Sequence, residues 1–159
     1  MINGVKIKKL KIHQDKDELG EKIRKPGFLM EILRSDEKLL KKFGQSTLTI
    51  SYQGTIKAFH SHEHQDDLWF VAKGSVKIVL CDLRKNSKTY KEIQEIMAGE
   101  NDYKVVLIPA GVAHGYQVLS RQPVLLFYHT TKPYDAKNPD EIRIPYDNKE
   151  IGYRWGNKK

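Results

Sequence analysis

Three histidines and an aspartate stand at spacings that suit proton transfer or metal binding. His60 and His62 are separated by one residue, Asp67 follows after four more, and His114 comes from a later segment. Because alternate residues of a β-strand face the same side, His60 and His62 are expected to point the same way. An imidazole accepts a proton near neutral pH, and imidazoles with a carboxylate also bind transition metals. His64 fits the same alternation but is equally consistent with a solvated side chain.

Glycines and a proline lie close to these residues in the sequence. The first stretch runs from Gly54 to Gly74 and resembles the first cupin motif, G(X)5HXH(X)4E(X)6G, with aspartate in place of glutamate. Residues 109–114 resemble the second motif, P-x-G-x-x-H. The turns at these positions are expected to bring the histidines together in the mouth of a small barrel, where such folds hold ligands.

The rest of the chain predicts the same fold class. Short β-branched and apolar runs, separated by glycine, proline and polar turns, predict strands throughout residues 45–130. We therefore expect an all-β cupin barrel, a double-stranded β-helix or jelly roll, in one domain over residues 1–159. Residues 1–44 form its N-terminal arm. Residues 131–159 are rich in proline, aspartate and asparagine, and are expected to wrap the barrel rather than join a sheet.

Four segments outside the main strand pattern carry their own predictions. Residues 3–13 alternate charged and apolar side chains, which indicates an edge strand or a strand swapped with a partner. Residues 27–34 suggest a strand or extended segment. Residues 35–44 begin with a serine N-cap and end with a glycine, which predicts a short helix. Residues 91–99 fit a helix or a strand.

Composition excludes several classes of protein. The net charge of +8 lies in lysine-rich stretches without interleaved aromatic residues, so no nucleic-acid partner is predicted. Cys81 is the only cysteine, which excludes an intrachain disulfide and suits a reducing compartment. No apolar run has the length of a signal peptide core or a membrane span. We therefore expect a cytoplasmic protein without a membrane partner.

Further blocks resemble, in the right order, the dTDP-4-dehydrorhamnose 3,5-epimerase family of sugar-nucleotide cupins. They are GFLME with FGQS, KAFH, CDLRKNSKTY, IPAGVAHGYQVLS, LLFYHTT with PYD, and DEIRIPYDNKEIGYRW. The resemblance implies an epimerase or isomerase that acts on a nucleotide-linked 4-keto-6-deoxy sugar in deoxysugar or surface polysaccharide synthesis. It also implies a homodimer that works without a cofactor.

The resemblance assigns roles to individual residues. His60 falls on the family's catalytic base and Tyr128 on its catalytic acid. A neutral imidazole suits removal of a proton next to a ketone, and a tyrosine on the opposite face can return a proton with inversion. The enolate needs a cation or hydrogen-bond donor, for which His114 and Lys57 are candidates. The positions implied to bind substrate are Lys57, His62, Arg84, His114 and Tyr134.

One departure from the family favours a metal. The family has glutamine and lysine where this chain has His62 and Asp67, so the chain holds a set of three imidazoles and one carboxylate. One divalent transition metal, such as Zn, Fe, Ni or Mn, suits that set, whose members are His60, His62, Asp67 and His114. A metal-dependent cupin enzyme is therefore an alternative function.

A second departure concerns the base. The family pairs its base with an aspartate beyond the last tryptophan block, and no counterpart follows Trp155. Asp67 and Asp147 are the candidates to orient His60 instead, because an oriented base needs a partner on its second nitrogen. Without such a partner, a sugar-binding cupin that has lost catalysis is a further alternative. Aromatic residues are candidates to line the pocket and stack on a base or sugar, namely Trp69, Phe70, Tyr116, Tyr134 and Trp155. Core packing is preferred for Trp69 and Phe70, because adjacent residues of a strand face opposite ways.

Overall fold

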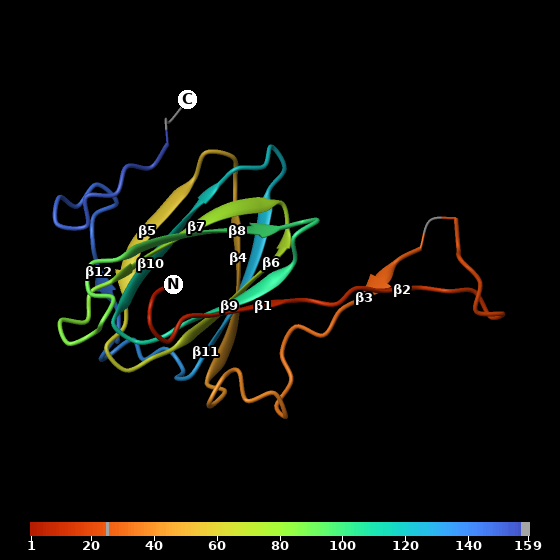
Figure 1. Ribbon diagram of the computed structural model, residues 1–159, viewed down its shortest axis with the longest axis horizontal. Helices are drawn as coiled ribbons and strands as arrows, with labels where there is room; N and C mark the ends of the chain where they lie inside the picture. Colours follow the sequence, from red (N-terminus) through yellow and green to blue (C-terminus); the bar gives the residue numbers. More distant parts are fainter. Residues whose placement is uncertain (25, 157–159) are drawn as a thin grey trace.

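The computed structural model describes residues 1–24 and 26–156, and it forms β-strands with no helix in those ranges (Figure 1). Two antiparallel five-stranded sheets face each other. The first has the order β1 (Lys6–Lys9), β9 (Lys104–Ile108), β6 (Asp67–Lys73), β11 (Val124–Thr130) and β4 (Gln45–Ser51). The second has the order β12 (Ile142–Arg143), β5 (Ile56–Ser61), β10 (Val112–Val118), β7 (Ser75–Asp82) and β8 (Ile93–Gly99). The predicted all-β architecture is confirmed.

The space between the sheets is apolar at one end and lined with polar groups at the other. Ile78, Val106 and Leu126 are at most 1% exposed and form part of the core between the sheets. Trp69 and Tyr116 belong to the same cluster and also line a cavity. The barrel is therefore filled from one end, and its other end remains open to a ligand.

The predicted short helix over residues 35–44 is wrong. This segment forms turns and bends, and Lys38 has φ of 50°, a left-handed conformation that interrupts a right-handed helix. Leu39 and Leu40 instead pack against the outer face of β6 and β9. Burial of two apolar side chains on a sheet face outweighs the weak local preference for a helix.

A search of the described residues for an apolar helix of membrane-spanning length finds none.

The C-terminal segment does join a sheet, contrary to expectation. Strand β12 pairs with β5, with Ile142 opposite Ser61 and Arg143 opposite His60. Ile144 extends the pairing through two backbone hydrogen bonds with Phe59, at 2.8 and 2.9 Å. The pairing covers what would otherwise be an open strand edge, and it brings the C-terminal segment to the site.

The structure also decides the predictions for the three remaining segments. Residues 91–99, which fitted helix or strand, contain strand β8, and residues 3–13 contain β1, which pairs with β9 of its own chain at the sheet edge. Residues 27–34 form only the short strand β3 (Phe28–Leu29), which pairs with β2 (His13–Gln14).

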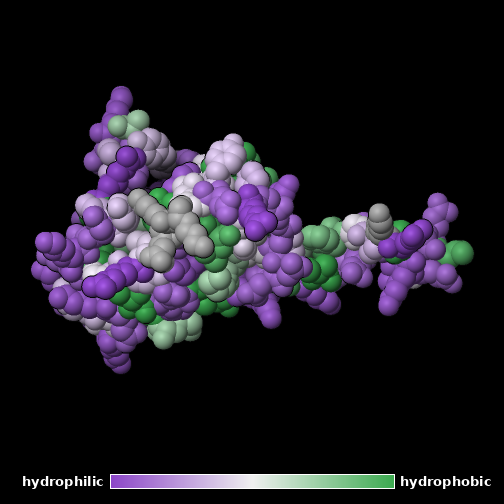
Figure 2. All heavy atoms as spheres, turned by 90° about the horizontal axis from the view of Figure 1, so that it is seen from above, coloured by the Kyte–Doolittle hydropathy of each residue, from purple (hydrophilic) through white to green (hydrophobic). Residues whose placement is uncertain are grey.

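Strands β2 and β3 form a hairpin arm that projects from the barrel (Figure 1). Figure 2 shows this arm as a narrow extension on which apolar atoms lie among hydrophilic ones. Its exposed apolar side chains are Ile12, Leu19, Ile23, Phe28 and Leu29, which are between 40% and 86% exposed. An arm that exposes these apolar side chains is typical of a segment that packs on another molecule.

Candidate functional site

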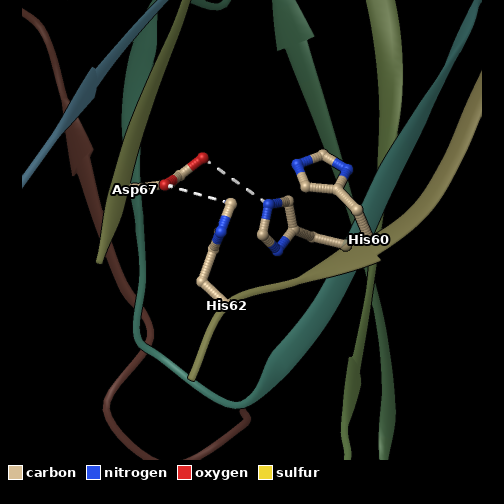
Figure 3. Close-up of side chains that lie close together, drawn as sticks. His60, His62 and Asp67 are labelled. Carbon is tan, nitrogen blue, oxygen red and sulfur yellow. Dashed lines mark ion pairs between the residues drawn. The ribbon is translucent and has the colours of Figure 1, made fainter. Parts of the chain in front are cut away.

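The four residues singled out by the sequence converge at the open end of the barrel. His60 on β5 and His114 on β10 are direct cross-strand partners, with ring centroids 4.1 Å apart. His62 follows β5, and its ring lies 5.4 Å from that of His60. Asp67 begins β6 on the facing sheet and reaches across to the histidines (Figure 3). One ring nitrogen or carboxylate oxygen from each of the four lies within 4.8 Å of the others.

Gly115 allows β5 and β10 to approach closely beside the site. A Cβ atom at this position would lie 2.3 Å from the Ala58 Cβ, so no side chain can be accommodated without displacing β5. The strand register shifts between His114 and Tyr116, on either side of this glycine. The close approach brings the His114 ring against the His60 ring.

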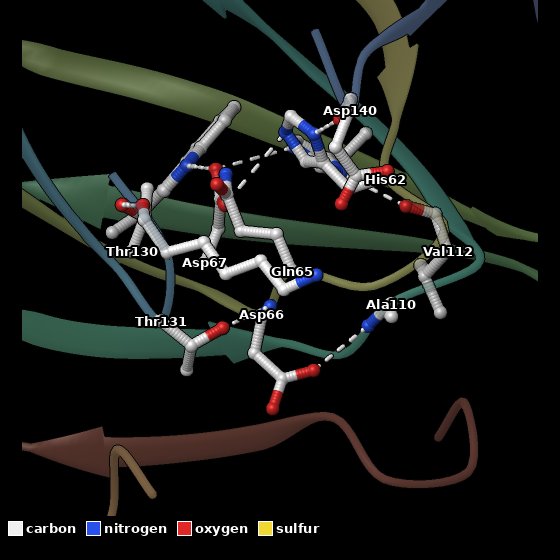
Figure 4. Close-up of polar contacts among 12 residues, drawn as sticks. His62, Gln65, Asp66, Asp67, Ala110, Val112, Thr130, Thr131 and Asp140 are labelled. Carbon is white, nitrogen blue, oxygen red and sulfur yellow. Dashed lines mark hydrogen bonds and ion pairs between the residues drawn. The ribbon is translucent and has the colours of Figure 1, made fainter. Parts of the chain in front are cut away.

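Backbone carbonyls fix the tautomers of two histidines. The His114 Nδ1 donates to the Val112 carbonyl oxygen at 2.8 Å, and the His62 Nδ1 donates to the Asp140 carbonyl oxygen (Figure 4). Because a carbonyl oxygen only accepts, the proton of each neutral ring sits on Nδ1 and each Nε2 keeps a lone pair. Within the described residues, the buried His114 Nε2 has no hydrogen-bond partner. Both lone pairs therefore point into the site.

Asp67 is a buried carboxylate held by two neutral donors. The Trp69 Nε1 donates to one oxygen at 3.1 Å and the Gln65 Nε2 to the other at 2.8 Å. The His62 and His114 Nε2 atoms lie 3.7 and 3.6 Å from its oxygens. Burial opposes ionisation, but the hydrogen bond from Gln65 is among the contacts that keep the pKa of Asp67 below the ordinary carboxyl value. Asp67 is therefore ionised at neutral pH.

His60 is neutral and presents a lone pair. Its ring stacks on Trp69 with centroids 6.1 Å apart and an interplanar angle of 29°. Burial, followed by the neighbouring His114, lowers the pKa of His60 well below the ordinary histidine value. Since only an unprotonated imidazole can accept a proton, this environment keeps His60 in the form that a base requires.

Neither candidate orienting carboxylate pairs with His60. In residues 1–24 and 26–156, Asp67 forms its ion pairs with His62 and His114, and no carboxylate forms one with His60. Asp147 is exposed and does not line the cavity. Packing of the His60 ring between Trp69 and His114 provides its orientation instead.

A cavity of about 1050 Å³ opens from this cluster and is lined by both sheets. Tyr128 lies on β11 of the first sheet, while His60 lies on β5 of the second, and both line the cavity. Burial raises the pKa of Tyr128, so its hydroxyl group stays protonated at neutral pH. The cavity thus has a neutral base on one wall and a proton donor on the other, and its volume matches that of sites for large small-molecule ligands.

The other predicted binding residues have different locations. Lys57 lines the cavity and its Nζ donates to the Thr49 hydroxyl at 2.8 Å, and Tyr134 lines the outer part of the cavity. The structure does not bring Arg84 there. Its guanidinium group is held by the fully buried carboxylate of Asp82, with two hydrogen bonds of 2.8 Å. A guanidinium fixed in this way stabilises the turn that follows β7 and does not reach the cavity of its own chain.

Several cavity residues were missed by the sequence analysis. Arg143 is the cross-strand partner of His60, and Lys132 follows β11, so both bring positive charge to the cavity. Asp140 holds the loop after β5, where its carboxylate accepts the backbone N–H groups of Glu63 and His64 at 2.8 and 3.0 Å. Trp69 is buried as predicted, but it also forms part of the cavity wall. No local pattern marks these residues, since each is placed by pairing between distant segments.

Comparisons with known proteins agree on one family. The family model described as dTDP-4-dehydrorhamnose 3,5-epimerase matches residues 1–159. The chain is 48% identical over 155 residues to the spore coat polysaccharide biosynthesis protein SpsL of Bacillus subtilis, covering 98% of this chain and 97% of that protein. It is 32% identical over 156 residues to the probable low-salt glycan biosynthesis epimerase Agl13 of Haloferax volcanii, covering 97% and 94%.

A solved structure supports the same assignment. The dTDP-6-deoxy-D-glucose-3,5-epimerase RmlC from Legionella pneumophila, in complex with dTDP-4-keto-L-rhamnose, superimposes with a TM-score of 0.81 at 26% identity. The alignment covers 98% of this chain and 80% of that one. Both the predicted cupin barrel and the predicted family are confirmed. The chain belongs to the dTDP-4-dehydrorhamnose 3,5-epimerase family.

Proposed function

We propose that this protein is an epimerase that acts on a nucleotide-linked 4-keto-6-deoxy sugar, with His60 as the base and Tyr128 as the acid. The observation that carries the proposal is the placement of a neutral imidazole and a protonated phenol on facing sheets, across one cavity. Inversion at a carbon next to a ketone needs a proton to leave from one face and another to arrive at the opposite face.

The proposed chemistry uses groups that the cavity supplies. The His60 lone pair takes the proton from the carbon next to the ketone, and the electron pair of that C–H bond forms an enolate. Tyr128 then gives its hydroxyl proton to the opposite face, so the configuration inverts. Afterwards the His60 imidazolium releases its extra proton to water and the Tyr128 phenolate takes one up from water, which restores both residues. The ammonium of Lys57, which lines the cavity, is the candidate to stabilise the enolate oxygen, since the His114 Nε2 carries a lone pair rather than a proton.

Charge and aromatic residues at the cavity suit a nucleotide diphosphate. Lys132 and Arg143 are exposed cations that line it, and Tyr134 offers an exposed ring on which a base could stack. The overall charge of +8 would attract such an anion from solution. The names of SpsL and Agl13 support a role in surface polysaccharide or glycan synthesis. A cytoplasmic location is supported by the single, buried Cys81, which has no disulfide partner.

Solvent exchange tests this function. The protein is incubated in heavy water with a panel of 4-keto-6-deoxy sugars linked to different nucleoside diphosphates, and deuterium uptake is followed by mass spectrometry and NMR. We expect deuterium at a carbon next to the ketone of at least one substrate. Binding of a substrate without any exchange would favour a sugar-binding cupin instead.

We also propose a homodimer held together by the hairpin arm. The arm exposes apolar side chains beyond its own barrel, and Leu29 on β3 is 60% exposed. If these side chains pack on a partner, Leu29→Glu places a charge in that interface. A loss of about 1.4 kcal/mol corresponds to a tenfold weaker dimer, and a buried unpaired charge costs more than this.

Light scattering after size-exclusion chromatography measures the effect. The wild type is expected to elute as a dimer and Leu29→Glu as a monomer at the same concentration. Met97→Glu is the matched control, because Met97 is 50% exposed but lies on β8 of the barrel. A monomeric wild type, or equal behaviour of the two variants, would rule out this interface.

A further inference from the structure

Four electron-pair donors converge where the cavity opens from the cluster, and among the described residues no hydrogen bond places a proton donor between them. The His62 and His114 Nε2 atoms carry lone pairs, because their Nδ1 protons are committed to backbone carbonyls. Asp67 contributes a carboxylate, and His60 a ring nitrogen, all within 4.8 Å of one another. Such groups repel one another unless a cation lies among them.

The distances fit a coordinated ion better than a hydrogen bond. The Asp67 oxygens lie 3.7 Å from the His62 Nε2 and 3.6 Å from the His114 Nε2, which exceeds the length of an N–H···O bond. Ligand atoms around a tetrahedral ion at about 2.1 Å are separated by roughly 3.4 Å. Small shifts of these side chains would therefore complete a coordination shell.

Burial provides an independent observation. The His114 side chain is 2% exposed, and among the described residues its Nε2 has no hydrogen-bond partner although it points toward Asp67. A buried acceptor left without a partner is costly, and native proteins rarely retain one without a purpose. A bound ion would supply the missing partner.

Hydrogen bonds to groups outside the cluster fix His62, His114 and Asp67 in the manner of a metal site. Metal-binding histidines usually donate their other N–H to a carbonyl or carboxylate, as His62 and His114 do here. The Asp67 carboxylate is itself positioned by hydrogen bonds from the Trp69 side chain and from the Gln65 side chain, which lies beside it in Figure 4. Such partners orient the lone pairs before any ion arrives.

We propose that His60, His62, Asp67 and His114 bind one divalent transition metal ion. Three imidazoles and a single carboxylate favour ions such as Zn²⁺, Co²⁺, Ni²⁺ or Fe²⁺ over Mg²⁺ and Ca²⁺, which take oxygen ligands. A lone pair given to a metal cannot accept a proton. Metal binding and the role of His60 as a base therefore exclude each other, a consequence that rests on the proposed function.

Direct metal measurements test the site without any substrate. Protein purified without chelator is analysed for metals, then stripped and titrated with Co²⁺, whose visible absorption reports nitrogen coordination. We expect about one ion per chain, and a dissociation constant raised at least tenfold by His62→Ala or by Asp67→Asn. His62→Gln serves as a second variant that keeps the size of the side chain, and circular dichroism checks that each variant is folded. His64→Ala is the control, because His64 is exposed and outside the cluster, and it should bind Co²⁺ as the wild type does.

Two results would overturn the proposal. The first is a wild type that takes up no Co²⁺, and the second is uptake that is unchanged in the folded His62→Ala and Asp67→Asn variants. A further arm compares solvent exchange in stripped and Zn²⁺-loaded protein, where loading should suppress exchange. Undiminished exchange in protein shown to hold zinc would remove His60 from the ligand set. Absence of exchange in both forms would count against the epimerase alone, since the cobalt titration does not depend on it.

Discussion

His60→Ala should reduce deuterium uptake next to the sugar ketone by roughly 10²- to 10⁴-fold, the usual contribution of a general base. The reason is that the variant keeps the cavity but loses the lone pair that accepts the proton. The rate is measured by NMR under saturating substrate in heavy water. Substrate affinity, measured by calorimetry, should change much less than the exchange rate.

Two comparisons make this result specific to the base. His13→Ala removes an exposed imidazole on β2, outside the lining of the cavity, and should leave the exchange rate close to that of the wild type. His60→Gln keeps a polar side chain of similar length without a basic nitrogen, and should be as impaired as His60→Ala. Exchange that persists undiminished in both His60 variants would show that another group removes the proton.

Tyr128→Phe should separate exchange from inversion. Without the phenol, His60 can still remove the proton and return a solvent deuteron to the same face, so uptake should remain within a few-fold of the wild type. Inversion should fall by roughly 10²- to 10⁴-fold, because no acid remains on the opposite wall. The ring itself is retained, so its packing beside the core is preserved. Both rates are obtained from one NMR time course.

The control for this variant concerns the neighbour of the phenol. Thr47 is the cross-strand partner of Tyr128 on β4 and hydrogen-bonds to its hydroxyl group. Thr47→Val removes that bond but leaves the phenol in place, so it should slow inversion far less than Tyr128→Phe. An inversion rate unchanged in Tyr128→Phe would assign the acid to a different residue, and equal loss of exchange and inversion would contradict the separation of the two roles.

The sequence was most informative where a short-range rule applied. His60 and His62 lie on one side of a strand because side chains alternate, and this could be read from their spacing alone. The convergence of His114 with His60 followed from the two motifs. The contribution of Asp67 depends on how the two sheets face each other, which spacing along the chain does not determine.

Long-range pairing explains the failures. Residues 35–44 have a helical sequence pattern, but Leu39 and Leu40 pack against an apolar sheet face. That contact determines the conformation of the segment. Arg84 is a different case, because a local contact with Asp82, two residues earlier, holds its guanidinium group away from the lining of the cavity. Arg143 reaches the site only because β12 pairs with β5, which the proline-rich sequence gave no reason to expect.

The fate of the hydrogen at the inverted carbon tests the central claim most directly. The wild-type protein converts a 4-keto-6-deoxy sugar nucleotide in heavy water, and the product is isolated and examined by NMR for configuration and isotope. Removal of a proton by His60 and its replacement from Tyr128 predict deuterium at every inverted carbon, because the new proton comes from a group that exchanges with solvent. An inverted carbon that retains its original hydrogen would contradict this mechanism.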